Sequence, residues 1–153
     1  MTKKKLIIIS ASSRLIKEPT KPIPAIERYD GVYFRVLRKS LREGKLRNID
    51  ILVLSEKFGL VWASDKIPFH EPHPGAWGSL SLSKKDMNKL RKKNLQKIKK
   101  IITRYSEIYV NVGWEYIKLI EGFEKFTTCR ITYAIAKGLG PKASHMKEWV
   151  TSQ

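Results

Sequence analysis

The polar residues that end the most apolar stretch of the chain are the first candidates for chemistry. That stretch, Ile49–Leu60, begins with Ile, Leu and Val and ends in Ser55, Glu56, Lys57 and then Gly59. The apolar run is typical of a central strand in a parallel sheet covered on both faces. Gly59 allows the chain to turn sharply behind the polar residues. We therefore expect a site here, with an ordinary polar turn as the alternative.

Acid–base chemistry is one use for these residues. Ser55, Glu56 and Asp65 are the candidate catalytic residues, with Glu56 or Asp65 as general base on a water that attacks a glycosidic carbon. Such a reaction would process a flipped base, which needs a stacking aromatic and polar groups that read its edge. Trp62, Phe69 and Trp77 supply either a stacking surface or contacts that clamp the loop to the core.

We predict neither a metal nor a cofactor. His70, Glu71 and His73 lie close in the sequence, but Pro72 separates them and no helix spaces them as ligands. The chain also lacks a Gly-x-Gly-x-x-Gly fingerprint and a Walker lysine, which leaves no dinucleotide or P-loop motif. The single cysteine, Cys129, excludes an internal disulfide and a multi-cysteine zinc site.

Apolar runs that predict strands must position these residues. The runs alternate with helical patterns, which predicts a single α/β domain. We expect three layers, a mostly parallel sheet of four or more strands with helices on both faces. The predicted strands are Lys5–Ser10, Ile49–Leu54, Glu107–Val112 and Cys129–Ala136.

Helical spacing of apolar residues appears between these strands. Asp30 is the predicted N-cap of a helix that Gly44 ends, and Ser83-x-x-Asp86 has the spacing of a capping box. Proline density over residues 17–27 predicts an extended loop without a helix. Gly138, Gly140 and Pro141 should separate the last strand from the last helix. The remaining predicted helices are Ser83–Tyr105, Trp114–Ile120 and Ala143–Val150.

Ligands in such sheets bind in the crevice beyond the carboxyl ends of the strands. A serine-rich turn follows the first strand, and Gly113 and Tyr116 follow the third. Hydroxyl groups in such a turn can bind a phosphate or a base, although a solvated loop is the alternative. The predicted binding residues are Ser10, Ser12, Arg14, Tyr29, Lys57, Gly59, Trp62, Gly113 and Tyr116.

Positive charge is the strongest global signal in the sequence. Lys and Arg number 31 against 14 Asp and Glu, a net charge of +17. Such an excess attracts polyanions, most often nucleic acid, through counterion release. A thermophile-like, lysine-rich surface is the alternative, but such surfaces balance Lys with Glu. The predicted contacts to a nucleic-acid backbone are Lys85, Lys89, Lys92, Lys93, Lys97 and Lys100.

Several of these motifs together resemble the YaaA-like proteins, a group of peroxide-stress, DNA-binding proteins with shorter relatives of unknown function. The stretch Leu54-Ser55-Glu56-Lys57-Phe58-Gly59-Leu60 is similar to the group's Ser-Ala-Lys-Tyr/His-Gly-Leu motif. Glu56 replaces a small residue, Ser10 replaces a common cysteine, and no helix-hairpin-helix insertion is evident. The other matching pieces are Ser10-x-Ser12, Pro24-Ala25…Tyr29…Phe34, Gly113…Tyr116 and Gly138-Leu139-Gly140.

The resemblance implies nucleic-acid binding, with DNA favoured over RNA, and neighbouring members are suspected of modified-base chemistry. Two other classes stay open: an enzyme that processes a small nucleotide or nucleoside, and a non-catalytic accessory protein that binds a protein partner. No apolar run approaches the roughly 18–20 residues of a membrane span. We therefore expect a cytoplasmic protein without a membrane partner.

Overall fold

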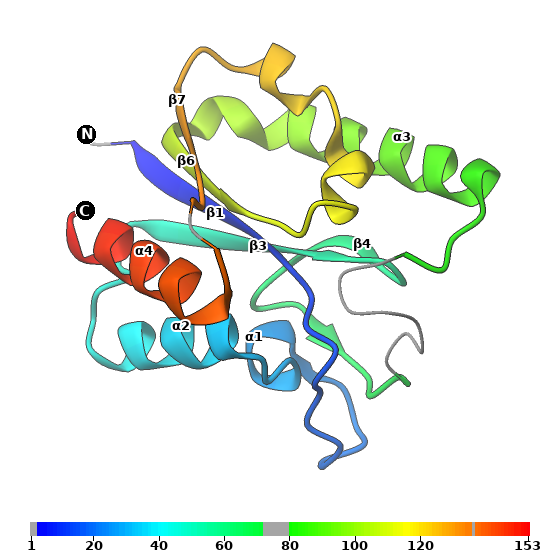
Figure 1. The fold of residues 1–153 in the computed structure, drawn as a ribbon, viewed down its shortest axis with the longest axis horizontal. Coiled ribbons are helices and arrows are strands. Elements are labelled where there is room, and N and C mark those ends of the chain that lie inside the picture. Colours follow the sequence, from blue (N-terminus) through cyan, green and yellow to red (C-terminus); the bar gives the residue numbers. More distant parts are fainter. Residues whose placement is uncertain (1–2, 72–79, 136) are drawn as a thin grey trace.

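A five-stranded sheet forms the centre of the computed structural model, which describes residues 3–71, 80–135 and 137–153 (Figure 1). Its strand order is β4-β3-β1-β6-β7. β1 (Lys4–Ser10), β3 (Ile49–Ser55), β6 (Tyr105–Asn111) and β7 (Arg130–Tyr133) are parallel, and β4 (Gly59–Trp62) runs antiparallel to β3. The predicted α/β fold class with a mostly parallel sheet is confirmed.

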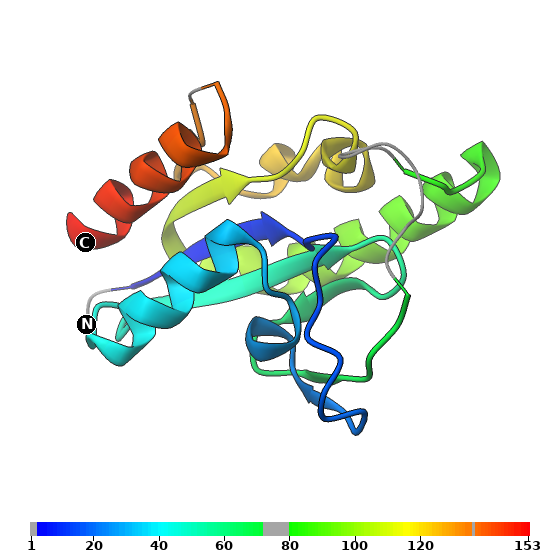
Figure 2. The same ribbon diagram turned by 60° about the horizontal axis from the view of Figure 1, so that its bottom comes forward.

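Helices cover both faces of the sheet, which gives three layers (Figure 2). One face carries α1 (Ala25–Arg28), α2 (Val32–Arg42) and α4 (Leu139–Thr151). The opposite face carries α3 (Lys84–Ile101) and three short 3-10 segments. These segments are η1 (Ile102–Arg104), η2 (Tyr116–Ile120) and η3 (Phe123–Phe126). None of the helices in the described part of the chain has the length and apolar character to cross a membrane.

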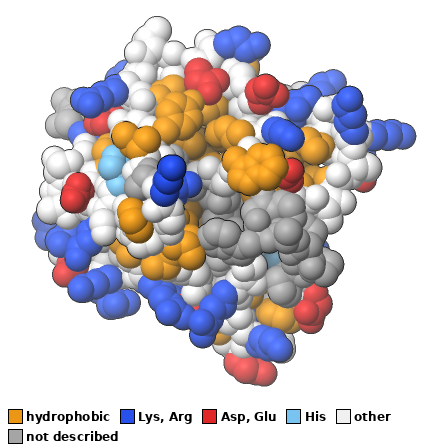
Figure 3. Space-filling model, in the orientation of Figure 1, with side chains coloured by type: hydrophobic (Ala, Val, Ile, Leu, Met, Phe, Trp, Pro, Cys, Tyr) orange, Lys and Arg blue, Asp and Glu red, His pale blue; other side chains and the backbone are white. Residues whose placement is uncertain are grey.

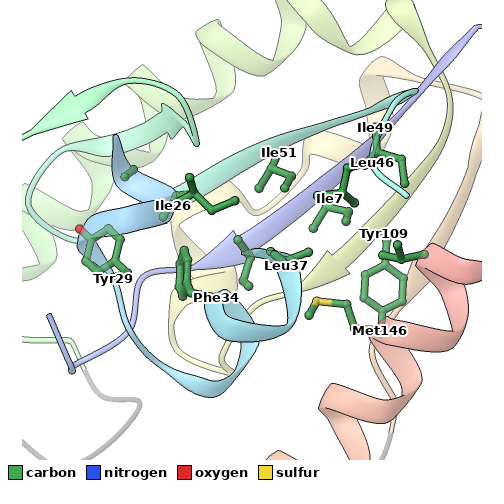
Figure 4. Packing of buried hydrophobic residues seen from close by; sticks show 14 of the residues in the cluster. Ile7, Ile26, Tyr29, Phe34, Leu37, Leu46, Ile49, Ile51, Tyr109 and Met146 are labelled. Carbon is green, nitrogen blue, oxygen red and sulfur yellow. The ribbon is translucent and has the colours of Figure 1, made fainter. Parts of the chain in front are cut away.

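Alternate residues of β1 pack into the two hydrophobic cores, because successive side chains of a strand point to opposite faces of the sheet. Ile7 and Ile9 pack toward α2 and α4, whereas Leu6 and Ile8 pack toward α3. Figure 4 shows the first of these cores, in which Phe34 and Leu37 of α2 lie against the sheet. All of these side chains are at most 1% exposed. A strand buried on both faces explains why β1 reads as an unbroken apolar run.

The chain changes direction around β1. It leaves β1 for β3 on one side, then crosses through α3 to β6 on the other side. The parallel strands therefore end at one edge of the sheet, and the connections that follow β1 and β6 lead to opposite sides of the sheet from there. This is the topological position at which doubly wound sheets bind ligands. The loops after Ser10, Ser55 and Asn111 all leave from that edge.

The long basic helix begins where its capping box predicts. Ser83 is the N-cap of α3, and its hydroxyl accepts a hydrogen bond from the Asp86 amide at 3.1 Å. The helix is shorter than predicted, however. It ends at Ile101, the chain tightens into η1, and Tyr105 already begins β6.

Other predicted boundaries are corrected. Gly31, not Asp30, is the N-cap of α2, because the Asp30 carboxylate binds Arg35 and Arg38 instead. α4 begins at Leu139, so Gly140 and Pro141 lie in its first turn, where the missing proline N–H has no helical partner to lose. The last strand covers only Arg130–Tyr133, and the predicted helix over residues 114–120 is the 3-10 segment η2.

The proline-rich loop contains more structure than its sequence suggests. β2 (Ile23–Pro24) pairs with β5 (Lys66–Ile67), and α1 follows directly after Pro24. Arg28 of α1 is fully buried and donates to the backbone carbonyls of Ile16, Lys21 and Ile67. Three carbonyl acceptors offset the cost of burying the guanidinium. Arg28 thereby holds the loop and β5 together.

Asn94 is the buried polar residue that fixes α3 to the sheet. It is 1% exposed, and its Oδ1 accepts from the Leu60 amide of β4 at 3.0 Å. Its Nδ2 donates to the Leu119 carbonyl of η2, also at 3.0 Å. One amide side chain thus satisfies a donor and an acceptor on two different segments. It lies on the apolar stripe of α3, which sequence periodicity alone assigns to hydrophobic contacts.

We predict that Asn94→Ala destabilises the protein by about 2–4 kcal/mol, because two buried backbone groups each lose a partner worth roughly 1–3 kcal/mol. Urea unfolding followed by tryptophan fluorescence measures the change. Gln96→Ala is the matched control, since Gln96 is exposed on the same helix. A loss for Asn94→Ala no larger than for the control would contradict this account of α3 packing.

Candidate functional site

The serines after β1 close loops at the strand ends. Ser10 Oγ accepts from the Gly113 amide at 3.3 Å, which joins the ends of β1 and β6. Ser12 Oγ accepts from the Gly31 amide at 3.2 Å and donates to the Arg14 carbonyl. A Cβ at Gly31 would lie 2.7 Å from the Ser12 Cβ, so glycine is needed for this close approach. Both hydroxyls therefore hold backbone, where the sequence suggests a phosphate or a base.

A hydrogen-bonded relay lies beside them at the end of β3. Ser55 is 1% exposed, its Oγ accepts from the amides of Lys57 and Phe58, and its side chain lies close enough to the Tyr29 hydroxyl to lower the Tyr29 pKa. The Tyr29 hydroxyl lies 3.2 Å from His70 Nε2. The His70 Nδ1 lies 3.3 Å from the Glu71 carbonyl. These contacts agree when Nδ1 carries the proton and Nε2 accepts from Tyr29.

Aromatic packing and nearby charges complete this strand-end cluster, which we define as Tyr29, Ser55, Glu56, His70 and Tyr116. The Phe58 ring meets His70 edge-on at 5.2 Å between centroids. Burial raises the pKa of Tyr29, although the Ser55 hydrogen bond opposes that rise. Burial, with Glu56 and Tyr29 nearby, raises the pKa of Tyr116 to about 12.

The cluster favours neutral tyrosine and histidine side chains at neutral pH. Burial lowers the pKa of His70, and the positive charges of Lys57 and Arg28 lower it further, against the opposing Glu71 carbonyl. A neutral imidazole accepts a proton, and protonated tyrosines donate hydrogen bonds. This arrangement suits polar recognition or proton transfer more than it suits a charged nucleophile.

The two predicted catalytic carboxylates bind backbone instead of lying free. Glu56 Oε1 accepts from the Ser81 amide at 2.6 Å and from the Ser81 hydroxyl. Asp65 Oδ2 accepts from the Trp62 amide at 2.8 Å and closes the turn after β4. Trp62 pairs with Leu52, three residues before the end of β3, which is roughly 10 Å along the strand. Asp65 and Trp62 therefore lie away from the strand-end cluster.

Three other predicted binding residues are also placed by local contacts. Arg14 is exposed and pairs with Asp30 at 3.5 Å. Lys57 is exposed, with its Nζ 5.7 Å from the centroid of the neighbouring Phe58 ring. Gly59 has φ +72°, and a Cβ there would lie 2.7 Å from Asn94 Oδ1. A glycine is thus required at position 59, at the end of the Ser55–Gly59 motif, because α3 packs closely against it.

Two residues with polar contacts in this region, His70 and Glu115, are not among the predicted site residues. His70 enters the sequence argument only beside His73, which lies outside the described residues, as does Trp77. Its partner Tyr29 is 41 positions away, a separation that no local pattern reveals. Glu115 binds the Leu80 amide at 2.7 Å, a counterpart to Glu56 on Ser81. Within the described residues, no three His, Cys, Asp or Glu side chains group as a metal site.

The lysines of α3 form an outward-facing basic surface. None of its members makes a salt bridge within the described part of the chain. Lys97 is not a member, because its Nζ donates to the Leu60 carbonyl at 2.8 Å and lies over the Trp62 ring. Figure 3 shows Lys and Arg side chains spread widely over the visible face. We define the lysine face as Lys85, Lys89, Lys92, Lys93 and Lys100, all exposed.

An open groove of about 440 Å³ adjoins the lysine face, between α3 and η3. Its lining mixes positive charge, side-chain amides and apolar surface. Lys99 Nζ lies 5.8 Å from the centroid of the Phe126 ring. We define the α3 groove by its lining residues, which are Asn88, Arg91, Lys92, Leu95, Gln96, Lys99 and Phe126.

Comparisons with known proteins found a structural neighbour whose function is unknown. No protein-family model matches the chain, and no curated protein matches it. A crystal structure of AF0587, a protein of unknown function, aligns at 12% sequence identity with a TM-score of 0.49. The alignment covers 97% of this chain and 45% of that one, so this chain spans under half the length of its neighbour.

The lowered His70 pKa predicts a pH dependence of stability. In the unfolded chain His70 takes up a proton near pH 6.5, whereas in the folded protein it does so at a lower pH. The contribution of His70 to the free energy of unfolding is therefore fully present above about pH 6.5 and is lost as the pH falls below that value. We expect the thermal midpoint of His70→Gln to fall less between pH 7 and pH 5 than that of the wild type.

Differential scanning fluorimetry across that pH range measures the effect. Tyr29→Phe is the control, because it removes the bond to His70 but keeps the titrating group. Parallel pH profiles for wild type and His70→Gln would show that His70 does not carry this dependence.

Proposed function

We propose that the protein binds nucleic acid through the lysine face of α3. The observation that carries the proposal is the absence of salt bridges to these exposed lysines within the described residues. Lysines without acidic partners keep their counterions until a polyanion displaces them, and that release drives binding to phosphates. The resemblance to YaaA-like proteins supports DNA as the partner over RNA.

The contacts of several carboxylates with other groups of the protein support the same proposal. Glu56 and Glu115 accept hydrogen bonds from backbone amides, and Asp50 accepts from the Tyr105 hydroxyl. Asp30 pairs with three arginines, which lowers its pKa mainly through its hydrogen bond to Arg35. These acids stabilise the fold and do not balance the lysine face. The net charge of +17, which already counts these acids, would attract a polyanion at long range.

Loss of the lysine face should weaken nucleic-acid binding and flatten its salt dependence. We predict that Lys85→Gln/Lys89→Gln/Lys93→Gln lowers the magnitude of the slope of log K against log salt by up to about 2–3, at roughly 0.7–0.9 per phosphate contact. Fluorescence anisotropy with a labelled 20-mer over a salt series measures the slope.

The control removes equal charge elsewhere. Lys39, Lys66 and Lys147 are exposed on segments of the opposite face, and their triple glutamine variant should keep most of the slope. No binding by wild type at low salt would reject the proposed function. An equal loss in both triple variants would show that α3 is not the binding surface.

A second candidate function is chemistry on a nucleic-acid base, and the Ser55–Tyr29–His70 relay is its support. His70 is the basic member of the relay, and its Nε2 would accept a proton through the Tyr29 hydroxyl that donates to it, whereas the Glu56 and Asp65 carboxylates bind backbone amides. Tyr116 would supply a hydrogen bond or a stacking ring for the base. This candidate shares its ligand with the binding proposal.

The test is release of a base from damaged-base oligonucleotides, followed by cleavage at abasic sites. We expect activity in the wild type, retention in Glu56→Gln, and a loss of at least about 100-fold in His70→Gln, the usual contribution of a general base. Thermal midpoints measured beside activity separate lost chemistry from lost folding. If wild type leaves no abasic sites on any substrate, the enzymatic candidate is rejected.

A further inference from the structure

We infer that the α3 groove, extended by Trp114 and Lys118, binds single-stranded nucleic acid by stacking unpaired bases. The inference rests on the proposed function and adds the strand state of its ligand. Sites of this kind combine a positive groove that follows the backbone with aromatic rings that stack bases. Both components are present beside α3.

The groove itself supplies the first ring. Phe126 lines it, half-buried, with Lys99 Nζ 5.8 Å from the ring centroid. Lys92 adds a second positive charge to the lining. Asn88 and Gln96 contribute side-chain amides, which can donate to and accept from base edges. A phosphate at Lys92 or Lys99 would thus leave the adjoining base near an aromatic face.

Trp114 supplies the second ring. It is 70% exposed, more than any other aromatic side chain among the described residues. Lys118 Nζ lies 5.8 Å from its ring centroid, which repeats the lysine–aromatic pairing seen at Phe126. The ammonium group lies over one face of this exposed indole, and we infer that a base stacks on the remaining ring surface while Lys118 binds a phosphate.

Arg91 joins the two ring sites into one surface. It lines the groove, and its guanidinium donates to the Lys118 carbonyl at 3.4 Å and to the Asn88 side chain. Glu121 lies 3.9 Å from it, the one acidic group paired with the groove in the described residues. Arg91 thus links the groove that Phe126 lines to Lys118, whose ammonium group lies over the Trp114 ring.

The preference for a single strand over a duplex follows from which base faces the Phe126 and Trp114 rings can contact. In a duplex the bases are stacked on one another, and their faces are closed to side chains such as Phe126 and Trp114. An unpaired strand presents those faces while keeping its phosphates. The lysine face should bind either form, whereas the ring sites should distinguish them. These two contributions can be separated by substitution.

The experiment compares a 20-mer single strand, its duplex, and an abasic single strand with the same phosphates. We expect Trp114→Ala and Phe126→Leu each to weaken binding of the single strand by roughly 5- to 100-fold, as loss of base stacking does. Affinity for the duplex and for the abasic strand should change less than about twofold. Trp114→Phe should restore most of the loss.

Controls keep the result interpretable. Leu41→Ala removes an apolar side chain that is 55% exposed on α2, on the opposite face, and should leave all three affinities unchanged. Far-UV circular dichroism verifies that Phe126→Leu is folded. If the ring variants weaken all three ligands equally, or none, the inference is overturned while the proposed function stands. Failure of wild type to bind any of them rejects both.

Discussion

The two hydrogen bonds of the Asn94 side chain are the contact on which the arrangement of α3 depends. They join the helix to β4 and to η2, at positions 34 and 25 residues away in the chain. Gly59 must be glycine for this contact, because a Cβ would meet Asn94 Oδ1 at 2.7 Å and φ is +72°. Rotation of α3 about its axis is thereby fixed. The same constraint turns the lysine face outward, so a buried amide determines where the positive charge is displayed.

Several carboxylates bind backbone amides and are therefore not placed beside the lysines of α3. Glu115 and Glu56 accept hydrogen bonds from the backbone amides of the adjacent residues Leu80 and Ser81, respectively, just before α3 begins. Asp65 closes a turn instead of facing a ligand. The chain has 14 acidic residues against 31 basic ones, and the lysines of the lysine face make no salt bridge within the described residues. At the strand ends the tyrosine and histidine side chains are neutral, and most of the positive charge lies on the helix beside them.

Sequence patterns within single helices and strands predicted most of the fold. Features that depend on contacts between distant segments could not be predicted in this way. The apolar runs of β1, β3 and β6 and the Ser83 capping box were sufficient for the sheet and the long helix. β4 was missed because four residues give no clear alternation. Asp30 has the residue type of an N-cap, but Arg38, eight positions later, takes its carboxylate. For the candidate site, the sequence suggested Ser55 and Tyr29, but no local pattern could show that His70 lies 3.2 Å from the Tyr29 hydroxyl.

The strand-end cluster and the lysine face belong to one unit, and this bears on how the two candidate functions relate. The segment held by Glu56 and Glu115 leads directly into the N-cap of α3, so the helix begins beside the cluster. From Lys100 to Lys85 the helix rises by roughly 23 Å, at about 1.5 Å per residue. A nucleic-acid strand bound along that length would be directed toward Tyr29 and His70. Binding along α3 would then deliver an unpaired base to the relay, so chemistry there would require the lysine face, whereas binding would not require the relay.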